Sequence, residues 1–323
     1  MIDVLFTDTH FGWKNNSMTW LNSQMNFIYK QFIPTIKQLS KEDTIRVIHL
    51  GDVFDSRSTI STYVATKVVQ AFKDIRSVCN EFIIVCGNHD FYSPNSDTVN
   101  TVKLLLSNLD IDIVDTKILK RGDHAFIPWY VWESGQFECE DPHIKHVFCH
   151  ADILNEVIPN SVIGKTIYSG HMHIPSQRAT KKLYNLGSCY SLDFADSNST
   201  RGFYIRKDLD NHNFVEFIPN KESIRFHRLY NEEVLTTDLS KFNSNDYIEL
   251  YISETNMSCE EYTNAIKQYT SQFTHLWIIP QVVHSTGTIN EDFKEYDIAF
   301  IMESLIPDDL QDFFKKVKTR LNN

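Results

Sequence analysis

The chain has 323 residues and a net charge of −11, with 42% hydrophobic and 23% charged residues. This composition is typical of a globular protein, and the length fits one large α/β domain or a large domain with a smaller companion. The acidic balance excludes a strongly basic, non-specific nucleic-acid binder, and no apolar run approaches the roughly 18 residues of a membrane span.

The six cysteines include no Cys-x-x-Cys pair and are too sparse for a disulfide scaffold, which predicts a reducing compartment. Asp3 follows directly on Met1 and Ile2, so the start of the chain does not resemble a signal peptide. We therefore expect a cytoplasmic protein, in the host cell cytoplasm if the protein is viral.

The first hundred residues alternate between strand and helix patterns. Apolar runs predict strands at 2–7, 45–50 and 82–86. Helical spacing predicts a helix over 17–39, which Pro34 kinks or splits, then one from the cap Ser61 to Val78 and one capped by Asp97. This alternation predicts stacked sheets flanked by helices.

The chain then becomes rich in strands. Predicted strands span 111–114, 125–131, 144–149, 166–169, 183–186, 203–206 and 214–218, and the last two form a hairpin through the turn 208–213. Trp129, Tyr130 and Trp132 are expected to pack in a strand core, with stacking on bases as the alternative. This part of the chain predicts a second sheet.

The pattern changes near residue 222, where we place a domain boundary. A strand at 247–252, a helix that starts at the capping box 258–261 and a strand at 276–283 form a β-α-β module. A polar linker at 285–290 leads to two amphipathic helices. The predicted domains are therefore 1–222 (net charge −4), 223–290, and 291–323, and the last two together carry a net charge of −7.

Polar clusters follow the predicted strands of the first domain. Each contains residues that bind hard or borderline metal ions, and each lies where an α/β fold places its ligands, at the carboxyl end of a strand. A single cluster of this kind is often accidental, but five in this order are not. The clusters are Asp8-Thr9-His10, Gly51-Asp52, Gly87-Asn88-His89-Asp90, His150, and Gly170-His171-Met172-His173.

These residue types predict a two-metal site for phosphoester hydrolysis. Two ions about 3.5–4 Å apart neutralise phosphate oxygens and activate a water, and such a pair needs a bridging ligand. We assign that role to Asp52. Mixed carboxylate, amide and imidazole ligands suit Mn²⁺, Fe²⁺ or Zn²⁺ better than Mg²⁺, and we favour two Mn²⁺ ions.

The ordered motifs Asp-x-His, Gly-Asp-x-x-Asp, Gly-Asn-His-Asp, a lone His and Gly-His-x-His resemble the calcineurin-like metallophosphoesterase superfamily. Within it, the chain resembles the Mre11/SbcD nucleases, closest to the recombination endonuclease subunits of phages. This resemblance implies a four-layer sandwich of two stacked mixed sheets flanked by helices, with a small C-terminal α+β cap domain and terminal helices. It also implies a DNA substrate, a Rad50/SbcC-like ATPase partner and a homodimer.

The same resemblance implies the role of each residue. One metal ion would be held by Asp8, His10, Asp52 and His173, and the other by Asp52, Asn88, His150 and His171. His89 would face the substrate phosphate as the catalytic residue, and Asp90 would orient the loop. Asp55 departs from the nuclease pattern, which often has His at this position.

Other interpretations remain open. The same chemistry fits a phosphomonoesterase or a cyclic-nucleotide phosphodiesterase, and the same fold fits a non-catalytic scaffold that binds DNA or the ATPase. The tail at 291–323 either caps the second domain or docks on the ATPase. Four cations near the motifs either grip a DNA backbone or belong to solvated loops: Arg57, Arg178, Lys181 and Lys182.

Overall fold

The computed structural model describes residues 1–281 except 94–95, 136, 138, 179, 181 and 210–211. Residues 1–281 form one compact unit. The boundary predicted at 222 falls inside this unit, between the end of β14 (His212–Pro219) and the start of β15 (Phe226–Tyr230). The predicted linker at 285–290 and the predicted helices at 291–323 lie outside the described residues.

The first sheet is mixed and contains six strands in the order β14-β13-β1-β2-β3-β6. Strands β1, β2, β3 and β6 are parallel, and β13 pairs antiparallel with β1. The predicted hairpin is present as β13–β14. The bounds are β1 Ile2–Phe6, β2 Ile45–His49, β3 Glu81–Val85, β6 Asp112–Val114 and β13 Gly202–Leu209.

The second sheet also contains six strands, in the order β11-β12-β10-β9-β8-β7. Its four central strands are parallel, and its two edge strands are antiparallel to their neighbours. The bounds are β7 Leu119–Arg121, β8 His124–Ile127, β9 His146–His150, β10 Thr166–Gly170, β11 Ser176–Arg178 and β12 Leu183–Asn185.

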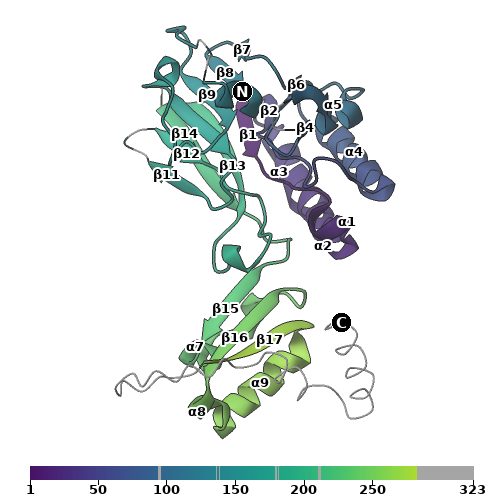
Figure 1. The fold of residues 1–323 in the computed structure, drawn as a ribbon, viewed down its shortest axis with the longest axis vertical. Helices are drawn as coiled ribbons and strands as arrows, with labels where there is room; N and C mark the ends of the chain where they lie inside the picture. The colour runs from purple at the N-terminus through teal and green to yellow at the C-terminus, as the bar shows by residue number, and fades with distance from the viewer. Residues whose placement is uncertain are drawn as a thin grey trace, which may run out of the picture. The chain divides into compact units, whose positions relative to one another are not determined.

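The two sheets stack through an apolar layer to which both contribute, including Leu5, Ile48, Phe126 and Phe148. Helices cover the outer face of the first sheet, and Figure 1 shows α3 and α4 on that side. The predicted architecture of two stacked mixed sheets flanked by helices is therefore confirmed. The helices are α1 Trp13–Asn16, α2 Met18–Asn26, α3 Ile33–Leu39, α4 Thr62–Arg76, α5 Thr101–Leu106 and α6 Trp129–Glu133.

The helix predicted over 17–39 is split, as Pro34 suggested. The π-helical segment η1 (Phe27–Phe32) separates α2 from α3, and Pro34 lies in the first turn of α3. A missing N–H costs nothing in a first turn. Ser61 caps α4 as predicted, since its side chain accepts a hydrogen bond from Val64 N at 3.2 Å.

Two local predictions are wrong. Asp97 does not cap a helix, because it lies in β5 (Ser96–Asn100), which pairs with β4 (Phe91–Ser93), and Asn100 caps α5 instead. The strand predicted at 125–131 ends at Ile127. Pro128 is the N-cap of α6, so Trp129, Tyr130 and Trp132 lie on a helix and not in a strand.

Residues 223–281 form a third, all-parallel sheet in the order β15-β16-β17. The predicted β-α-β module is present as β16 (Tyr247–Ser253), α8 (Glu254–Met257), α9 (Glu260–Gln272) and β17 (His275–Gln281). Figure 1 shows α9 along one face of this sheet. Sequence patterns missed β15 and α7 (Glu232–Thr236), which precede this module.

Candidate metal centre

All seven predicted metal ligands lie just beyond, or at the last residue of, five parallel strands. Asp8 and His10 follow β1, Asp52 follows β2, and Asn88 follows β3. His150 ends β9, and His171 and His173 follow β10. Parallel strands of both sheets thus deliver their carboxyl ends to one edge of the sandwich, and the seven side chains converge there.

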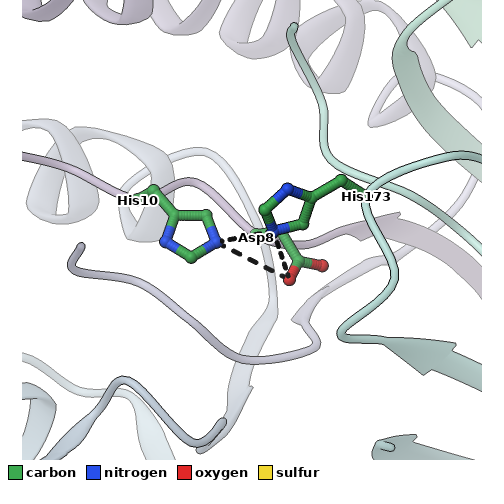
Figure 2. Close-up of side chains that lie close together, drawn as sticks. All are labelled: Asp8, His10 and His173. Carbon is green, nitrogen blue, oxygen red and sulfur yellow. Dashed lines mark hydrogen bonds and ion pairs between the residues drawn. The ribbon is translucent and has the colours of Figure 1, made fainter. Parts of the chain in front are cut away.

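The first group contains Asp8, His10 and His173. Figure 2 shows the two imidazole rings turned toward each other, with the Asp8 carboxylate beside them. The Nε2 atoms of His10 and His173 lie 3.1 Å apart, and Asp8 Oδ1 lies 3.9 Å and 4.0 Å from them. Asp8 and His10 are buried, whereas the His173 side chain is 33% exposed. The group is therefore open to solvent on one side.

The second group contains Asp52, Asn88, His150 and His171. Asn88 Oδ1 lies 3.0 Å from His150 Nε2 and 3.1 Å from His171 Nδ1, and Asp52 Oδ2 lies 3.4 Å from His150 Nε2. His150 Nδ1 lies 2.7 Å from the carbonyl of Leu50 and donates to it, which directs the Nε2 lone pair of the neutral ring into the group.

Asp52 lies between the two groups. Its Oδ2 is 3.8 Å from His10 Nε2 of the first group and 3.4 Å from His150 Nε2 of the second. Its Oδ1 accepts a hydrogen bond from His89 N at 2.8 Å, which fixes the orientation of the carboxylate. This is the position that a bridging ligand requires.

The donor set fits divalent ions. Ligands bound at about 2.0–2.2 Å around one ion lie roughly 3–3.5 Å from each other, which is the range of most of these separations. Imidazole nitrogens and carboxylate oxygens that face one another repel each other through their lone pairs. A cation bound between them removes this repulsion. The combination of N and O atoms matches Mn²⁺, Fe²⁺ or Zn²⁺.

The electrostatics of the metal-free groups agree with this fit. Burial lowers the pKa of His10 to about 3 and that of His171 to about 4, so both rings are neutral and available as ligands at neutral pH. Burial also acts against the charged form of His150, but the Asp52 carboxylate outweighs it and raises the pKa of His150 to about 9. In the metal-free protein, a proton on His150 thus provides part of the positive charge that a metal ion would supply.

His89 lies beside the first group and not within it. Its ring is 5.0 Å from the His10 ring, centre to centre, and its Nδ1 donates to the backbone carbonyl of Asp55 at 2.6 Å. Nε2 is therefore the nitrogen available to a substrate. Asp55 Oδ1 also lies 3.7 Å from His10 Nδ1, so Asp55 occupies a space next to both histidines.

Asp90 holds the two ligand loops together. Its Oδ2 accepts hydrogen bonds from Gly87 N at 2.8 Å and Asp52 N at 3.0 Å, and its Oδ1 accepts one from Val53 N at 2.9 Å. Burial and the Asp52 charge raise the pKa of Asp90 to about 7. This geometry agrees with the orienting role suggested for it.

Further positioning residues have no motif and were missed. His49 Nδ1 accepts a hydrogen bond from Gly51 N at 3.1 Å, and its Nε2 lies 3.0 Å from Thr9 Oγ1, so it ties the Asp8 loop to the Asp52 loop. Gln24 Nε2 donates to the carbonyl of Thr9 and to Tyr190 Oη, each at 2.9 Å. In the sequence, only His49 could have been suspected, because it lies two residues before Gly51. The contact of Gln24 with the Asp8 loop is visible only in the structure.

The backbone of the centre adopts conformations that few side chains tolerate. Asp8, His10, Asp52 and His171 have φ values of 51°, 38°, 54° and 89°. Non-glycine residues with positive φ cluster at functional sites because the surroundings must compensate their strain. Neighbouring glycines allow the close packing, since a Cβ on Gly87 would collide with Asp52 and His150.

The predicted cations have different surroundings. Arg178 and Lys182 are exposed, and Lys181 lies outside the described residues. Arg57 is half-buried, and its Nη1 has no hydrogen-bond partner among the described residues. Arg178 and Lys182 are therefore accessible to solvent, whereas the Nη1 atom of Arg57 is buried.

Comparisons with known proteins place these observations in context. The family model for calcineurin-like phosphoesterases matches residues 4–249, which include all seven predicted ligands and His89. No curated protein matches the chain. Within the part of the chain that the structure describes, no helix has the length and apolar content needed to cross a membrane.

Proposed function

The chain belongs to the calcineurin-like phosphoesterase family, and on this premise we propose that it is a metal-dependent DNA nuclease. The observation that carries the proposal is the convergence of six predicted nitrogen and oxygen ligands around a seventh, Asp52, with His89 beside them. Divalent ions bound there would act as Lewis acids on phosphate oxygens and lower the pKa of a bound water.

The residues of the chain supply the remaining steps. Because its Nδ1 is engaged by the Asp55 carbonyl, His89 can present Nε2–H to the oxygen that leaves phosphorus. Asp52 stays ionised, since burial raises its pKa but the charges of His150 and His10 lower it more, to well below its ordinary value. Asp52 therefore provides fixed negative charge for the cations.

Exposed side chains next to the candidate metal centre favour a large substrate over a small one. Tyr92, Met172 and Ile174 are 60%, 39% and 52% exposed, and each lies within two residues of Asp90 or a predicted ligand. Exposed aromatic and apolar side chains of this kind contact the bases of nucleic acids. These features support DNA as the substrate.

We also propose that the protein is the nuclease subunit of an Mre11–Rad50/SbcCD-like complex in recombination, repair or degradation of DNA. The support is the order of the motifs and the β-α-β module after the phosphoesterase core. In this proposal Mn²⁺ is the metal, the subunit forms a homodimer, and an SMC-like ATPase is its partner.

The test is cleavage of linear, hairpin and circular single-stranded DNA by the full chain with Mn²⁺, with and without the partner ATPase. Asn88→Ala and His89→Ala should each lower cleavage about 100-fold or more, while only Asn88→Ala should also weaken Mn²⁺ binding. His143→Ala is the matched control, because His143 is exposed and lies in none of the motifs.

Undiminished cleavage by both variants would contradict the proposal. Rapid hydrolysis of a small chromogenic phosphate without cleavage of DNA would support the monoesterase or cyclic-nucleotide alternative. Binding of DNA or of the ATPase without any hydrolysis would support the scaffold alternative.

A further inference from the structure

His10 has a buried ring nitrogen without a hydrogen-bond partner. Its side chain is 2% exposed, and its Nδ1 makes no hydrogen bond to any described residue. Its other nitrogen, Nε2, lies 3.1 Å from Nε2 of His173 in the first ligand group. When both neutral rings bind one metal ion through these Nε2 atoms, each ring carries its proton on Nδ1. The metal-bound centre therefore contains a buried Nδ1–H on His10 that needs an acceptor.

The carboxylate of Asp55 lies beside this nitrogen. Asp55 Oδ1 is 3.7 Å from His10 Nδ1, whereas a hydrogen bond from a ring N–H to a carboxylate is about 2.7–2.9 Å long. The Asp55 side chain is 23% exposed, and within the described part of the chain neither of its oxygens accepts a hydrogen bond. The carboxylate therefore needs to approach Nδ1 by about 1 Å, and no other contact of its oxygens has to break.

The backbone of Asp55 is held next to His10. Asp55 N donates to the carbonyl of Phe11 at 3.0 Å, and Phe11 N donates to the carbonyl of Val53 at 2.9 Å. The Asp55 carbonyl accepts the hydrogen bond from His89 Nδ1 at 2.6 Å. Because the backbone is fixed at both its N–H and its carbonyl, rotation of the Asp55 side chain alone can bring the carboxylate to Nδ1.

The position of Asp55 separates this role from direct binding of the same metal ion. Asp8 Oδ1 lies 3.9 Å from Nε2 of His10, on the side of the ring that faces the first group. Asp55 Oδ1 instead lies next to Nδ1, on the other side of the ring. Asp55 can therefore act on that ion through His10.

We propose that Asp55 is a positioning residue for the metal ion of the first group, and that its carboxylate accepts the Nδ1–H of His10 when Nε2 binds the ion. A carboxylate in this place fixes the tautomer and the orientation of a ligating histidine and makes the ring a stronger ligand. The inference rests on the proposed metal site but not on DNA as the substrate.

The test is calorimetric titration of the metal-free chain with Mn²⁺. Asp55→Ala keeps the backbone carbonyl that binds His89 and removes the carboxylate, so it should weaken binding of one of the two ions about tenfold or more. Asp55→Asn keeps an oxygen acceptor without the charge and should recover part of this loss. Both variants should unfold in EDTA at the same urea concentration as the unmodified chain, because the contact is longer than a hydrogen bond without the metal. A residue that only stabilised the fold would change unfolding in EDTA as well.

Asp152→Asn is the matched control for the loss of one negative charge near the centre. Asp152 is half-buried two residues after the predicted ligand His150, and its Oδ1 accepts hydrogen bonds from Leu154 N and Asn155 N of its own loop. This variant should change the affinity for Mn²⁺ by less than about threefold. Co²⁺ in place of Mn²⁺ adds a second measurement, since its visible absorption depends on the arrangement of its ligands. Asp55→Ala should change that spectrum, and Asp152→Asn should leave it unchanged.

His173→Ala distinguishes failure of this inference from failure of the metal site, because it removes a partly exposed ligand of the same ion. If the unmodified chain binds no Mn²⁺, or if His173→Ala binds Mn²⁺ as the unmodified chain does, the proposed metal site is wrong and the inference is wrong with it. If His173→Ala loses affinity and Asp55→Ala does not, the metal site stands and the inference alone is overturned. Equal weakening by Asp55→Ala and Asp152→Asn would also overturn it, since charge alone would then explain the effect.

Discussion

At the scale of single residues, Asp90 determines how well the predicted ligands can be held. It is fully buried, and its two oxygens accept hydrogen bonds from backbone N–H groups of two different loops. One of those loops carries Asp52 and the other Asn88. Asp90 therefore fixes the distance between the bridging carboxylate and a ligand of the second group without binding a metal itself.

We predict that Asp90→Asn weakens metal binding about 10- to 100-fold, the usual cost of losing a partner that orients ligands. The substitution replaces one oxygen with an amide NH₂ that faces backbone donors, so at least one buried N–H loses its acceptor. Titration of the metal-free protein with Mn²⁺ measures the effect. Asp110→Asn, at a carboxylate that is 88% exposed, should bind Mn²⁺ as the unmodified chain does. Equal affinity in the Asp90 variant would contradict the assigned role.

The residues that the sequence could predict are those that carry their own chemistry in a recognisable order. Asp8, His10 and His173 are examples, since 163 residues separate His10 from His173 and yet their Nε2 atoms face each other. His49 and Tyr190 could not be predicted, because their role depends on which loop they happen to pack against.

At the scale of elements, the centre depends on how closely the turns after β2 and β3 approach each other. A Cβ on Gly87 would collide with Asp52 N, Asp52 Oδ1 and His150 Cε1. These atoms belong to the bridging ligand and to a ligand from the other sheet. Glycine is therefore required at this position by contact and not by backbone conformation.

Gly87→Ala should leave the fold intact and abolish or weaken metal binding by more than about tenfold, because the methyl group displaces Asp52 and His150 from the second group. Circular dichroism and Mn²⁺ titration separate the two effects. Gly122→Ala is the control, since φ is 56° there and no atom lies within 4 Å of the added Cβ. That variant should lose about 1 kcal/mol of stability and keep its metal affinity. Equal metal affinity in both variants would contradict this account.

Strand ends were the most predictable elements because buried parallel strands are short apolar runs followed by polar residues. Boundaries that depend on tertiary pairing were not predictable. Residues 96–100 form a strand because β4 is there to pair with, although Asp97 has the chemistry of a helix cap. The aromatic run after Pro128 has strand-forming residues, but Pro128 starts a helix there. Pairing with β16 similarly defines β15.

At the scale of the whole molecule, a buried cluster of charges joins the two sheets at the end opposite the metal centre. Asp3 of β1 accepts hydrogen bonds from Arg46 Nε at 2.8 Å and Arg206 Nη1 at 2.5 Å. His124 of the second sheet lies 3.1 Å from Arg46 Nη2 and 3.0 Å from Arg206 Nη1 through its Nε2. All four residues are buried, and the carboxylates of Glu81 and Asp123 lie next to Arg46 and His124.

The cluster has a pH dependence that follows from Asp3. Burial acts to raise the pKa of Asp3, but the hydrogen bond with His124 and the charges of Arg46 and Arg206 outweigh it, so the pKa of Asp3 is lowered. A lowered pKa means that the folded state binds this proton less readily than the unfolded state. The stabilisation is therefore complete above the unfolded value of about 3.9 and is lost as the pH falls through the folded value.

We accordingly predict that Asp3→Asn destabilises the full chain by about 3–5 kcal/mol at pH 7, because two buried arginines lose their counter-charge. The penalty should be the same at pH 5, where Asp3 is still ionised in both states of the unmodified chain. It should shrink near pH 3, where protonation begins to remove the same stabilisation from the unmodified chain. Urea unfolding in EDTA at the three pH values measures it, with Asp110→Asn as the exposed control. A penalty below about 1 kcal/mol, or one that grows as the pH falls, would show that the charge of Asp3 does not hold the two sheets together.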